Sequence, residues 1–142
     1  MKALIDTNVI LDFLLAREPH YEAAKEIFSL TYQGKIDTYT TASSITDIYY
    51  IIAKKLGADA AREALRNLFN LLVIITVDGE DCVLALDLPI TDYEDALVTT
   101  CAQKTDVDLI ITNDADFLNT GNPLVKVVNS TDFICLLNSF GK

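Results

Sequence analysis

Two short segments, one at the start of the chain and one in its last third, each run from apolar residues into aspartate. In DLIITNDADF (108–117), Asp114 and Asp116 follow three apolar residues, and in KALIDTN (2–8) the apolar run stops at Asp6. Carboxylates that lie close together disfavour each other's ionisation unless a positive charge sits between them. The pattern therefore predicts that these aspartates share a cation.

Two further aspartates fall near the starts of expected helices, Asp47 in SSITDIYY and Asp95 in DYEDALVTTCA. If both helices begin at the edge of the sheet where the apolar strands end, their carboxylates converge with the others. An oxygen-rich site without His or Cys suits Mg²⁺ or Mn²⁺, which would activate a water and bind phosphate oxygens. The candidate catalytic residues are Asp6, Asp47, Asp95, Asp114 and Asp116.

Each of these carboxylates also has a purely structural interpretation. Asp6 would cap a helix, Asp95 would favour the positive end of its helix, and aspartates after a strand commonly form Asx turns. Asp47 would be solvated, although Tyr50 and Ile51 share its helix face and predict partial cover. The remaining acids are interpreted as solvated or capping, among them Asp12 on a helix face and Asp78 and Asp81 near a turn.

Strand and helix candidates alternate along the chain. Apolar or β-branched runs predict strands over 2–6, 37–42, 72–77, 108–112 and 124–128, and the last three read as continuously apolar or buried. Helical spacing and punctuation predict helices over 7–16, 19–33, 43–56, 58–71 and 79–87, and from 91 and 130 onward, with caps at Ser43 or Ser44 and a Thr91–Glu94 capping box.

Continuous apolar strands separated by helices imply an α/β fold. We expect a three-layer α/β/α sandwich with a central, mainly parallel sheet, in which functional groups gather beyond the carboxyl ends of the strands. A length of 142 residues predicts a single domain over 1–142. No apolar run reaches about 18 residues, and no signal peptide is apparent, so we expect a cytoplasmic protein without a membrane span.

Composition narrows the chemistry. The chain has three dispersed cysteines and one histidine, which argues against a zinc site, a disulfide framework or a Ser-His nucleophile. The net charge of −10 is unfavourable for phosphate contacts. Two interpretations stay open: either the partners are not nucleic acids, or the acids gather where cations bind and bridge to phosphate.

The motifs resemble those of the PIN-domain family, metal-dependent nucleases that include the VapC-type toxins. LIDTNVILDFLL is similar to the opening motif of the family, DYEDALVTTCA to its central motif and IITNDADF to its closing motif, in the same order over residues 2 to about 128. The usual glutamate of the third helix is replaced by Asp47, which is one methylene shorter.

The resemblance implies a Mg²⁺- or Mn²⁺-dependent endoribonuclease that cleaves RNA phosphodiesters with metal-activated water. It implies metal ligands at Asp6, Asp95 and either Asp114 or Asp116, which are open alternatives. Asn8 and Thr112 would orient these carboxylates. The implied partners are an RNA substrate, an antitoxin protein and a second copy of the chain in a homodimer.

Two other classes of function compete with this one. The shorter Asp47 and the acidic surface favour a non-catalytic PIN-fold module that only binds. A phosphatase or phospho-acceptor domain on a similar sheet is disfavoured, because Asn8 stands where a haloacid-type phosphatase needs a second aspartate and only Asp6 stands at the acidic pair of a receiver domain.

Overall fold

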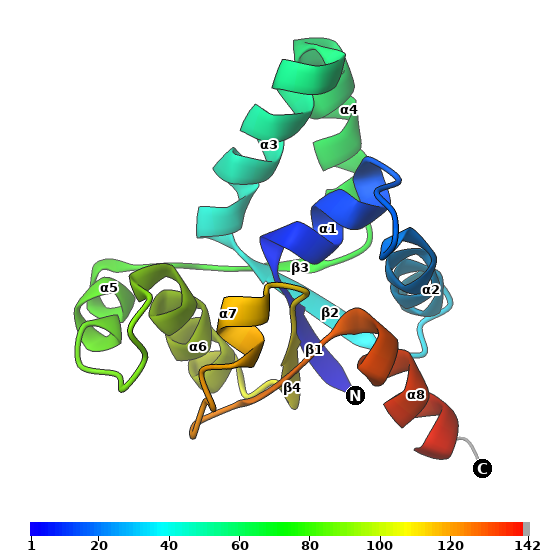
Figure 1. Ribbon diagram of the computed structural model, residues 1–142. Coiled ribbons are helices and arrows are strands. Elements are labelled where there is room, and N and C mark those ends of the chain that lie inside the picture. The colour runs from blue at the N-terminus through cyan, green and yellow to red at the C-terminus, as the bar shows by residue number, and fades with distance from the viewer. Residues whose placement is uncertain (141–142) are drawn as a thin grey trace.

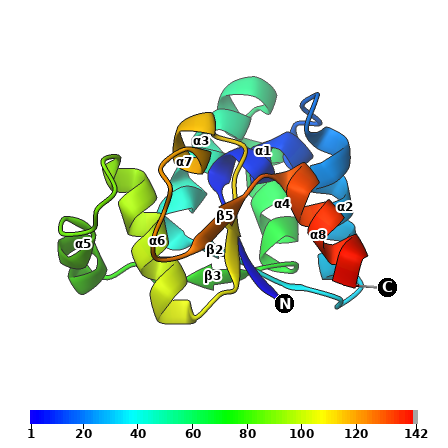
Figure 2. The same cartoon turned by 60° about the horizontal axis from the view of Figure 1, so that its bottom comes forward.

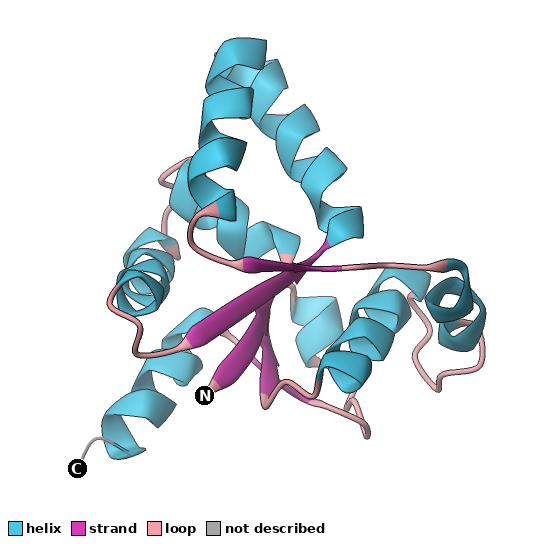
Figure 3. Ribbon diagram, turned by 180° about the vertical axis from the view of Figure 1, so that it is seen from behind, coloured by secondary structure: helices cyan, strands magenta, loops and turns pink. Residues whose placement is uncertain are grey.

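Five short strands form a twisted sheet at the centre of the protein (Figures 1 and 3). The computed structural model describes residues 1–140. Within them the sheet order is β3-β2-β1-β4-β5, and every neighbouring pair is parallel. The strands are β1 (Lys2–Ile5), β2 (Asp37–Thr41), β3 (Val73–Ile75), β4 (Leu109–Ile111) and β5 (Lys126–Val128).

Helices cover both faces of this sheet. The helices are α1 (Thr7–Leu14), α2 (Tyr21–Tyr32), α3 (Ala42–Leu56), α4 (Ala58–Phe69), α5 (Gly79–Ala85), α6 (Tyr93–Thr105), α7 (Ala115–Leu118) and α8 (Ser130–Phe140). Helices α3 and α4 form an antiparallel pair that projects from the sheet, while α5 and α6 lie towards the other side (Figure 1). None of the helices in residues 1–140 combines the length and apolar character needed to traverse a bilayer.

Alternation along the central strands divides the core between the two faces. Ala3 and Ile5 of β1 pack with residues of α1, α2, α3, α4 and α8, whereas Leu4 packs with residues of α6 and with Phe117 of α7. Because successive side chains of a strand point to opposite faces, a strand buried on both sides reads as a continuous apolar run. The predicted three-layer α/β/α architecture with a parallel sheet is confirmed.

One predicted strand is less buried than its sequence indicates. The run 72–77 forms the strand β3, but Val73 is 56% exposed and Ile74 is 37% exposed. The reason is its place in the sheet: β3 is an edge strand, while Figure 2 shows β5 at the opposite edge. Only Ile75 of this strand enters the core.

The predicted helix caps at two sites are wrong. Helix α3 begins at Ala42, so Thr41 holds the N-cap position in place of Ser43 or Ser44. Helix α6 begins at Tyr93, and its N-cap is Asp92, whose Oδ1 accepts a hydrogen bond of 3.0 Å from the backbone N–H of Asp95. The helix therefore starts one residue later than the predicted Thr91–Glu94 capping box requires, and Asp92 takes the capping position in place of Thr91.

Helix α7 is an element that the sequence did not predict. It spans only Ala115–Leu118, which is too short to show helical periodicity. It begins directly after Asp114, and its residue Phe117 is fully buried against the α6 face of the sheet. This short helix therefore fixes how the chain leaves β4, and with it the position of Asp114.

Candidate active site

The carboxyl ends of the two central strands bring Asp6 and Thr112 together. Strands β1 and β4 pair in register, with Ile5 opposite Ile111, and the backbone N–H of Asp6 continues the ladder by donating to the carbonyl oxygen of Ile111 at 2.9 Å. Asp6 and Thr112 follow these paired residues directly. Residues more than one hundred positions apart in sequence are thus neighbours at one edge of the sheet.

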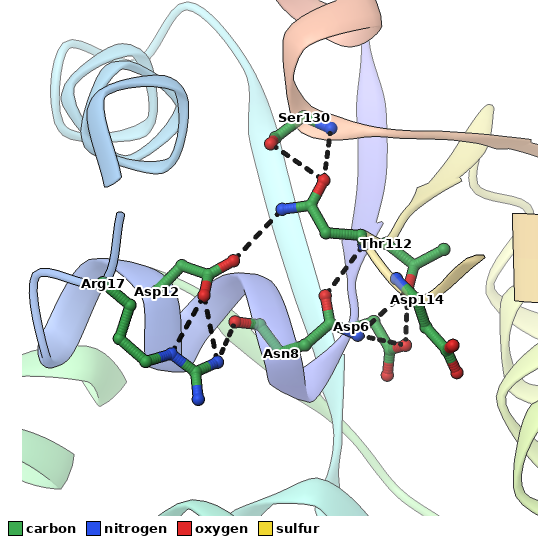
Figure 4. Close-up of polar contacts among 8 residues, drawn as sticks. Asp6, Asn8, Asp12, Arg17, Thr112, Asp114 and Ser130 are labelled. Carbon is green, nitrogen blue, oxygen red and sulfur yellow. Dashed lines mark hydrogen bonds and ion pairs between the residues drawn. The ribbon is translucent and has the colours of Figure 1, made fainter. Parts of the chain in front are cut away.

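The carboxylate of Asp6 is held by three hydrogen bonds (Figure 4). Its Oδ1 accepts from the backbone N–H of Thr7 at 2.8 Å, and its Oδ2 accepts from Asn8 Nδ2 at 3.1 Å and from Thr112 Oγ1 at 2.9 Å. Burial nevertheless raises the pKa of Asp6, with a further contribution from the nearby negative charge of Asp114, against the lowering effect of these hydrogen bonds. Asp6 therefore both caps α1 and presents an oriented carboxylate.

Asp95 lies in the first turn of α6, a helix that is buried along most of its length. The residue is only 9% exposed, and its pKa is raised to about 7, first by burial and then by the charges of Asp92, Asp6 and Asp114. Asp95 nevertheless lines an open cavity together with Asp6 and Asp114, so its side chain reaches solvent there. Asp95 is therefore a carboxylate that is costly to ionise unless a cation binds beside it.

The two aspartates after β4 lie differently. Asp114 caps α7, with its Oδ1 accepting from the backbone N–H of Asp116 at 3.1 Å, and its own N–H donates to Thr112 Oγ1 at 3.1 Å. Asp114 lines the same cavity as Asp6 and Asp95, whereas Asp116 does not. The geometry thus favours Asp114 over Asp116 as the acid of the closing motif.

A cavity of about 500 Å³ opens beside these residues. Asp47 of α3 is exposed and lines it, so the structure brings together four of the five predicted carboxylates. The expected cover of Asp47 is wrong: Tyr50 is 77% exposed and Ile51 is 37% exposed, because this face of α3 opens onto the cavity. The residues lining the cavity are Asp6, Thr7, Asn8, Leu11, Arg17, Ser43, Ser44, Asp47, Tyr50, Ile51, Glu94, Asp95, Val98 and Asp114.

Glu94 is a cavity residue that the sequence reasoning missed. Its pKa is raised by burial first, and then by the charges of Asp47, Asp6 and Asp92. Glu94 was predicted only as the second member of a capping box with Thr91. Its position directly beside Asp95 in the central motif was the available signal.

A second polar network, centred on the buried Asp12, supports the site from behind (Figure 4). Asp12 is 4% exposed, so its interpretation as a solvated acid is wrong. Its Oδ1 accepts from Arg17 Nε at 3.0 Å and its Oδ2 from Asn113 Nδ2 at 3.1 Å. Asn113 Oδ1 accepts in turn from the backbone N–H and the hydroxyl of Ser130, both at 3.1 Å. The network joins α1, the end of β4 and the start of α8.

Comparison with known proteins gives this arrangement a family. The family model described as PIN domain matches residues 2–116. The chain belongs to the PIN domain family. The match covers the opening and central motifs and all but the last residue of the closing motif, and it includes Asp6, Asp47, Asp95, Asp114 and Asp116.

One relative of this PIN domain is a VapC ribonuclease, and solved structures of VapC and VapBC proteins share its fold. This PIN domain is 26% identical over 137 residues to "Ribonuclease VapC1" of Aquifex aeolicus (strain VF5), covering 93% of this chain and 92% of that protein. Among solved structures, VapBC2 from Rickettsia felis, bound to a DNA fragment from its promoter, aligns with a TM-score of 0.70 at 15% identity, covering 91% of this chain and 98% of that one. VapC20 of Mycobacterium tuberculosis, a sarcin-ricin loop cleaving toxin, aligns with a TM-score of 0.67 at 16% identity, over 87% of this chain and 98% of that one.

The donor set of this PIN domain fits a hydrated divalent cation. Five carboxylates and no His or Cys line the cavity, which is the ligand chemistry of Mg²⁺ or Mn²⁺. Burial first, and then repulsion by neighbouring carboxylates, raises the pKa values of Asp6, Glu94 and Asp95, and a bound cation would offset both effects. Within residues 1–140, no three such side chains are close enough to enclose an ion together. This spacing suits Mg²⁺, which keeps several waters and takes one or two carboxylates directly.

Proposed function

We propose that this PIN domain is a Mg²⁺- or Mn²⁺-dependent endoribonuclease, and the toxin of a toxin–antitoxin pair. The observation that carries the proposal is the convergence of Asp6, Asp95 and Asp114, from three separate elements, on one acidic cavity. The ribonuclease name of the VapC1 relative supports the reaction. The VapBC complexes with the same fold support the toxin assignment.

The residues at the cavity would have different roles in hydrolysis. Asp6, Asp95 and Asp114 would hold the ion, one or two of them directly and the others through its bound waters, with Asp116 left outside the cavity. The ion, when bound, supplies a water of lowered pKa and a positive charge for the phosphate oxygens. Asn8 and Thr112 keep the Asp6 carboxylate in one orientation by their hydrogen bonds to its Oδ2. The Asp6 side chain is therefore already held in one conformation before substrate binds.

Glu94 and Asp47 face the cavity from α6 and α3. Burial, and then the charges of Asp47, Asp6 and Asp92, raise the pKa of Glu94, which makes its carboxylate a stronger proton acceptor than that of an ordinary glutamate. Asp47 is too short to repeat the reach of the usual glutamate. We infer that it acts through water, and that Glu94 supplies the neighbouring carboxylate.

We also propose that the protein binds an antitoxin, forms a homodimer and is located in the cytoplasm. Large apolar side chains are exposed along α3, α4 and β3, in particular Tyr50, Leu56, Phe69 and Val73. Exposed apolar surface of this kind is typical of protein–protein interfaces. Light scattering of the purified chain tests the homodimer, since a monomer mass would contradict it.

The direct test of the proposal is RNA cleavage with Mn²⁺. We expect the wild type to cleave single-stranded RNA, addition of a chelator to stop cleavage, and Asp6→Asn and Asp95→Asn to lose at least about a hundredfold in rate. Asp87→Asn, an exposed carboxylate outside the cavity, serves as the matched control for charge. Full activity in both active-site variants would contradict the assignment.

A non-catalytic binding module is the second candidate, and one observation favours it. Asp47 replaces a glutamate that is one methylene longer, which shortens the reach of one cavity carboxylate. Calorimetry separates the two functions. Absence of Mn²⁺ binding at millimolar concentration would support the binding module, whereas saturable binding lost in Asp95→Asn would support the nuclease.

A further inference from the structure

Arg17 is the one cationic side chain among the cavity-lining residues of the described chain. All the other charged groups that line the cavity are carboxylates. A phosphate chain that enters this cavity therefore meets strong repulsion except where the bound ion and Arg17 offset it.

The guanidinium of Arg17 is fixed along one edge. Its Nε donates to Asp12 Oδ1 at 3.0 Å, its Nη2 lies 3.0 Å from the same oxygen, and Nη2 also donates to the carbonyl oxygen of Asn8 at 3.1 Å. Asp12 is itself held by Asn113. A fork anchored in this way loses little conformational freedom when it binds a further acceptor.

The other edge of the guanidinium is available. The Arg17 side chain is 37% exposed, against 6% for the Asp12 side chain. Within residues 1–140, the structure records contacts from Nε and Nη2 but none from Nη1. Figure 4 shows Arg17 on one side of Asn8, with Asp6 and Asp114 on the other. Arg17 therefore lines the same cavity as the acidic groups but stands apart from Asp6 and Asp114.

We propose that Arg17 binds a non-scissile phosphate of the RNA strand, one that neighbours the phosphate being cleaved. The inference rests on the proposed ribonuclease function and names a substrate-binding residue for it. Nη1 donates to a phosphate oxygen while Asp12 and Asn8 retain the opposite edge. The contact sets the position of the strand relative to Asp6, Asp95 and Asp114, and no bond is made or broken at Arg17.

A purely structural role for Arg17 makes a different prediction. If Arg17 only neutralised Asp12, its replacement would lower the stability of the fold. RNA affinity, measured where all of the protein is folded, would then stay unchanged. Both roles predict a lower unfolding temperature for Arg17→Gln, because Asp12 loses its partner. Stability therefore does not distinguish a structural role of Arg17 from a phosphate-binding role, whereas the salt dependence of RNA binding does.

The experiment uses the full chain, a labelled single-stranded RNA and three variants: Arg17→Gln, Arg17→Lys and, as a matched control on the exposed side of α4, Arg66→Gln. Cleavage kinetics in Mn²⁺ give KM and kcat. Fluorescence anisotropy in Ca²⁺, with a gel to show that the RNA is intact, gives Kd as a function of salt. All measurements are made below the unfolding temperature of the least stable variant.

We expect Arg17→Gln to raise KM and Kd about tenfold, to change kcat much less, and to reduce the slope of log Kd against log salt by about 0.7. Arg17→Lys keeps the charge but lacks the fork, so it should retain the wild-type salt slope with weaker binding. Arg66→Gln should match the wild type. Unchanged KM and salt slope in Arg17→Gln would overturn the inference alone, whereas a wild type that neither binds nor cleaves RNA would overturn the proposed function.

Discussion

The hydroxyl of Thr112 donates a hydrogen bond of 2.9 Å to Asp6 Oδ2, across 106 positions of sequence. The same oxygen atom of Thr112 accepts from Asn8 Nδ2 at 3.0 Å and from the backbone N–H of Asp114 at 3.1 Å. Thr112 is fully buried, so all three of its hydrogen bonds are made inside the protein. One hydroxyl thus couples the opening motif to the closing motif.

Replacing Thr112 by valine should therefore weaken the site as well as the fold. Valine is close to threonine in shape but leaves Asn8 Nδ2 and the Asp114 N–H without this acceptor and Asp6 without one donor. We expect unfolding free energy to fall by about 1–3 kcal/mol and Mn²⁺ affinity by about tenfold or more. Urea unfolding and calorimetry measure these two quantities. Thr131→Val, at an exposed position of α8, is the control, and equal effects of the two substitutions would contradict the coupling role.

Asn substitutions should distinguish the two aspartates of the closing motif. Asp114 lines the cavity and Asp116 does not. Asparagine can still cap α7, so Asp114→Asn preserves the helix start while removing the charge. We expect Asp114→Asn to lose about a hundredfold or more in cleavage rate and Asp116→Asn less than about threefold. Steady-state cleavage of one RNA by both variants makes the comparison, and a larger loss at Asp116 would reverse the assignment.

Metal binding should depend on pH near neutrality. The pKa of Asp95 is raised to about 7 by burial and by its acidic neighbours, and only the ionised carboxylate binds a cation. Mn²⁺ affinity should therefore rise as pH increases from about 6 to 8, with release of about one proton per ion near pH 6.5. Calorimetry in two buffers of different ionisation enthalpy measures the protons released. An affinity that is flat over this range would show that Asp95 is already ionised below it.

The same carboxylate should make the metal-free protein less stable at higher pH. The pKa of Asp95 is about 7 in the folded state and lies near 3.8 without the fold, so the folded protein binds the extra proton between these values. Its contribution to stability is present below about pH 4 and is lost as pH rises to about 7. Asp95→Asn should therefore raise the unfolding temperature at pH 8 by about 2–5 °C and have little effect near pH 4.

Asp87→Asn, which removes an exposed carboxylate of the same charge, is the control for this measurement. Thermal unfolding is followed with a chelator present, because a bound ion would offset the repulsion. If Asp95→Asn were destabilising at pH 8, the burial cost assigned to the charged carboxylate would be wrong.

The architecture was readable from residue patterns because strands buried on both faces must be apolar throughout. The runs ALI at 3–5 and LII at 109–111 have no alternation, and such runs between helices have few solutions other than a covered parallel sheet. The carboxyl ends of parallel strands share one edge, which is why Asp6 and Asp114 were expected to meet. Local spacing sufficed for these inferences, since each depends on neighbours in sequence.

Other features depended on contacts between distant residues. The exposure of Val73 follows from the edge position of β3, which no property of the run itself reveals. The burial of Asp12 depends on Arg17 and Asn113, and the choice of Asp114 over Asp116 depends on the short helix α7.

The amino-acid order was therefore enough to specify the layers of the fold and the acidic residues at the ends of its central strands, because periodicity and strand ends are local properties. Which carboxylates face one cavity, which of them are buried, and where the single cation of that cavity points were settled by three-dimensional packing. Burial and electrostatic interaction act between groups that meet only when the chain has folded, so these properties have no local signature.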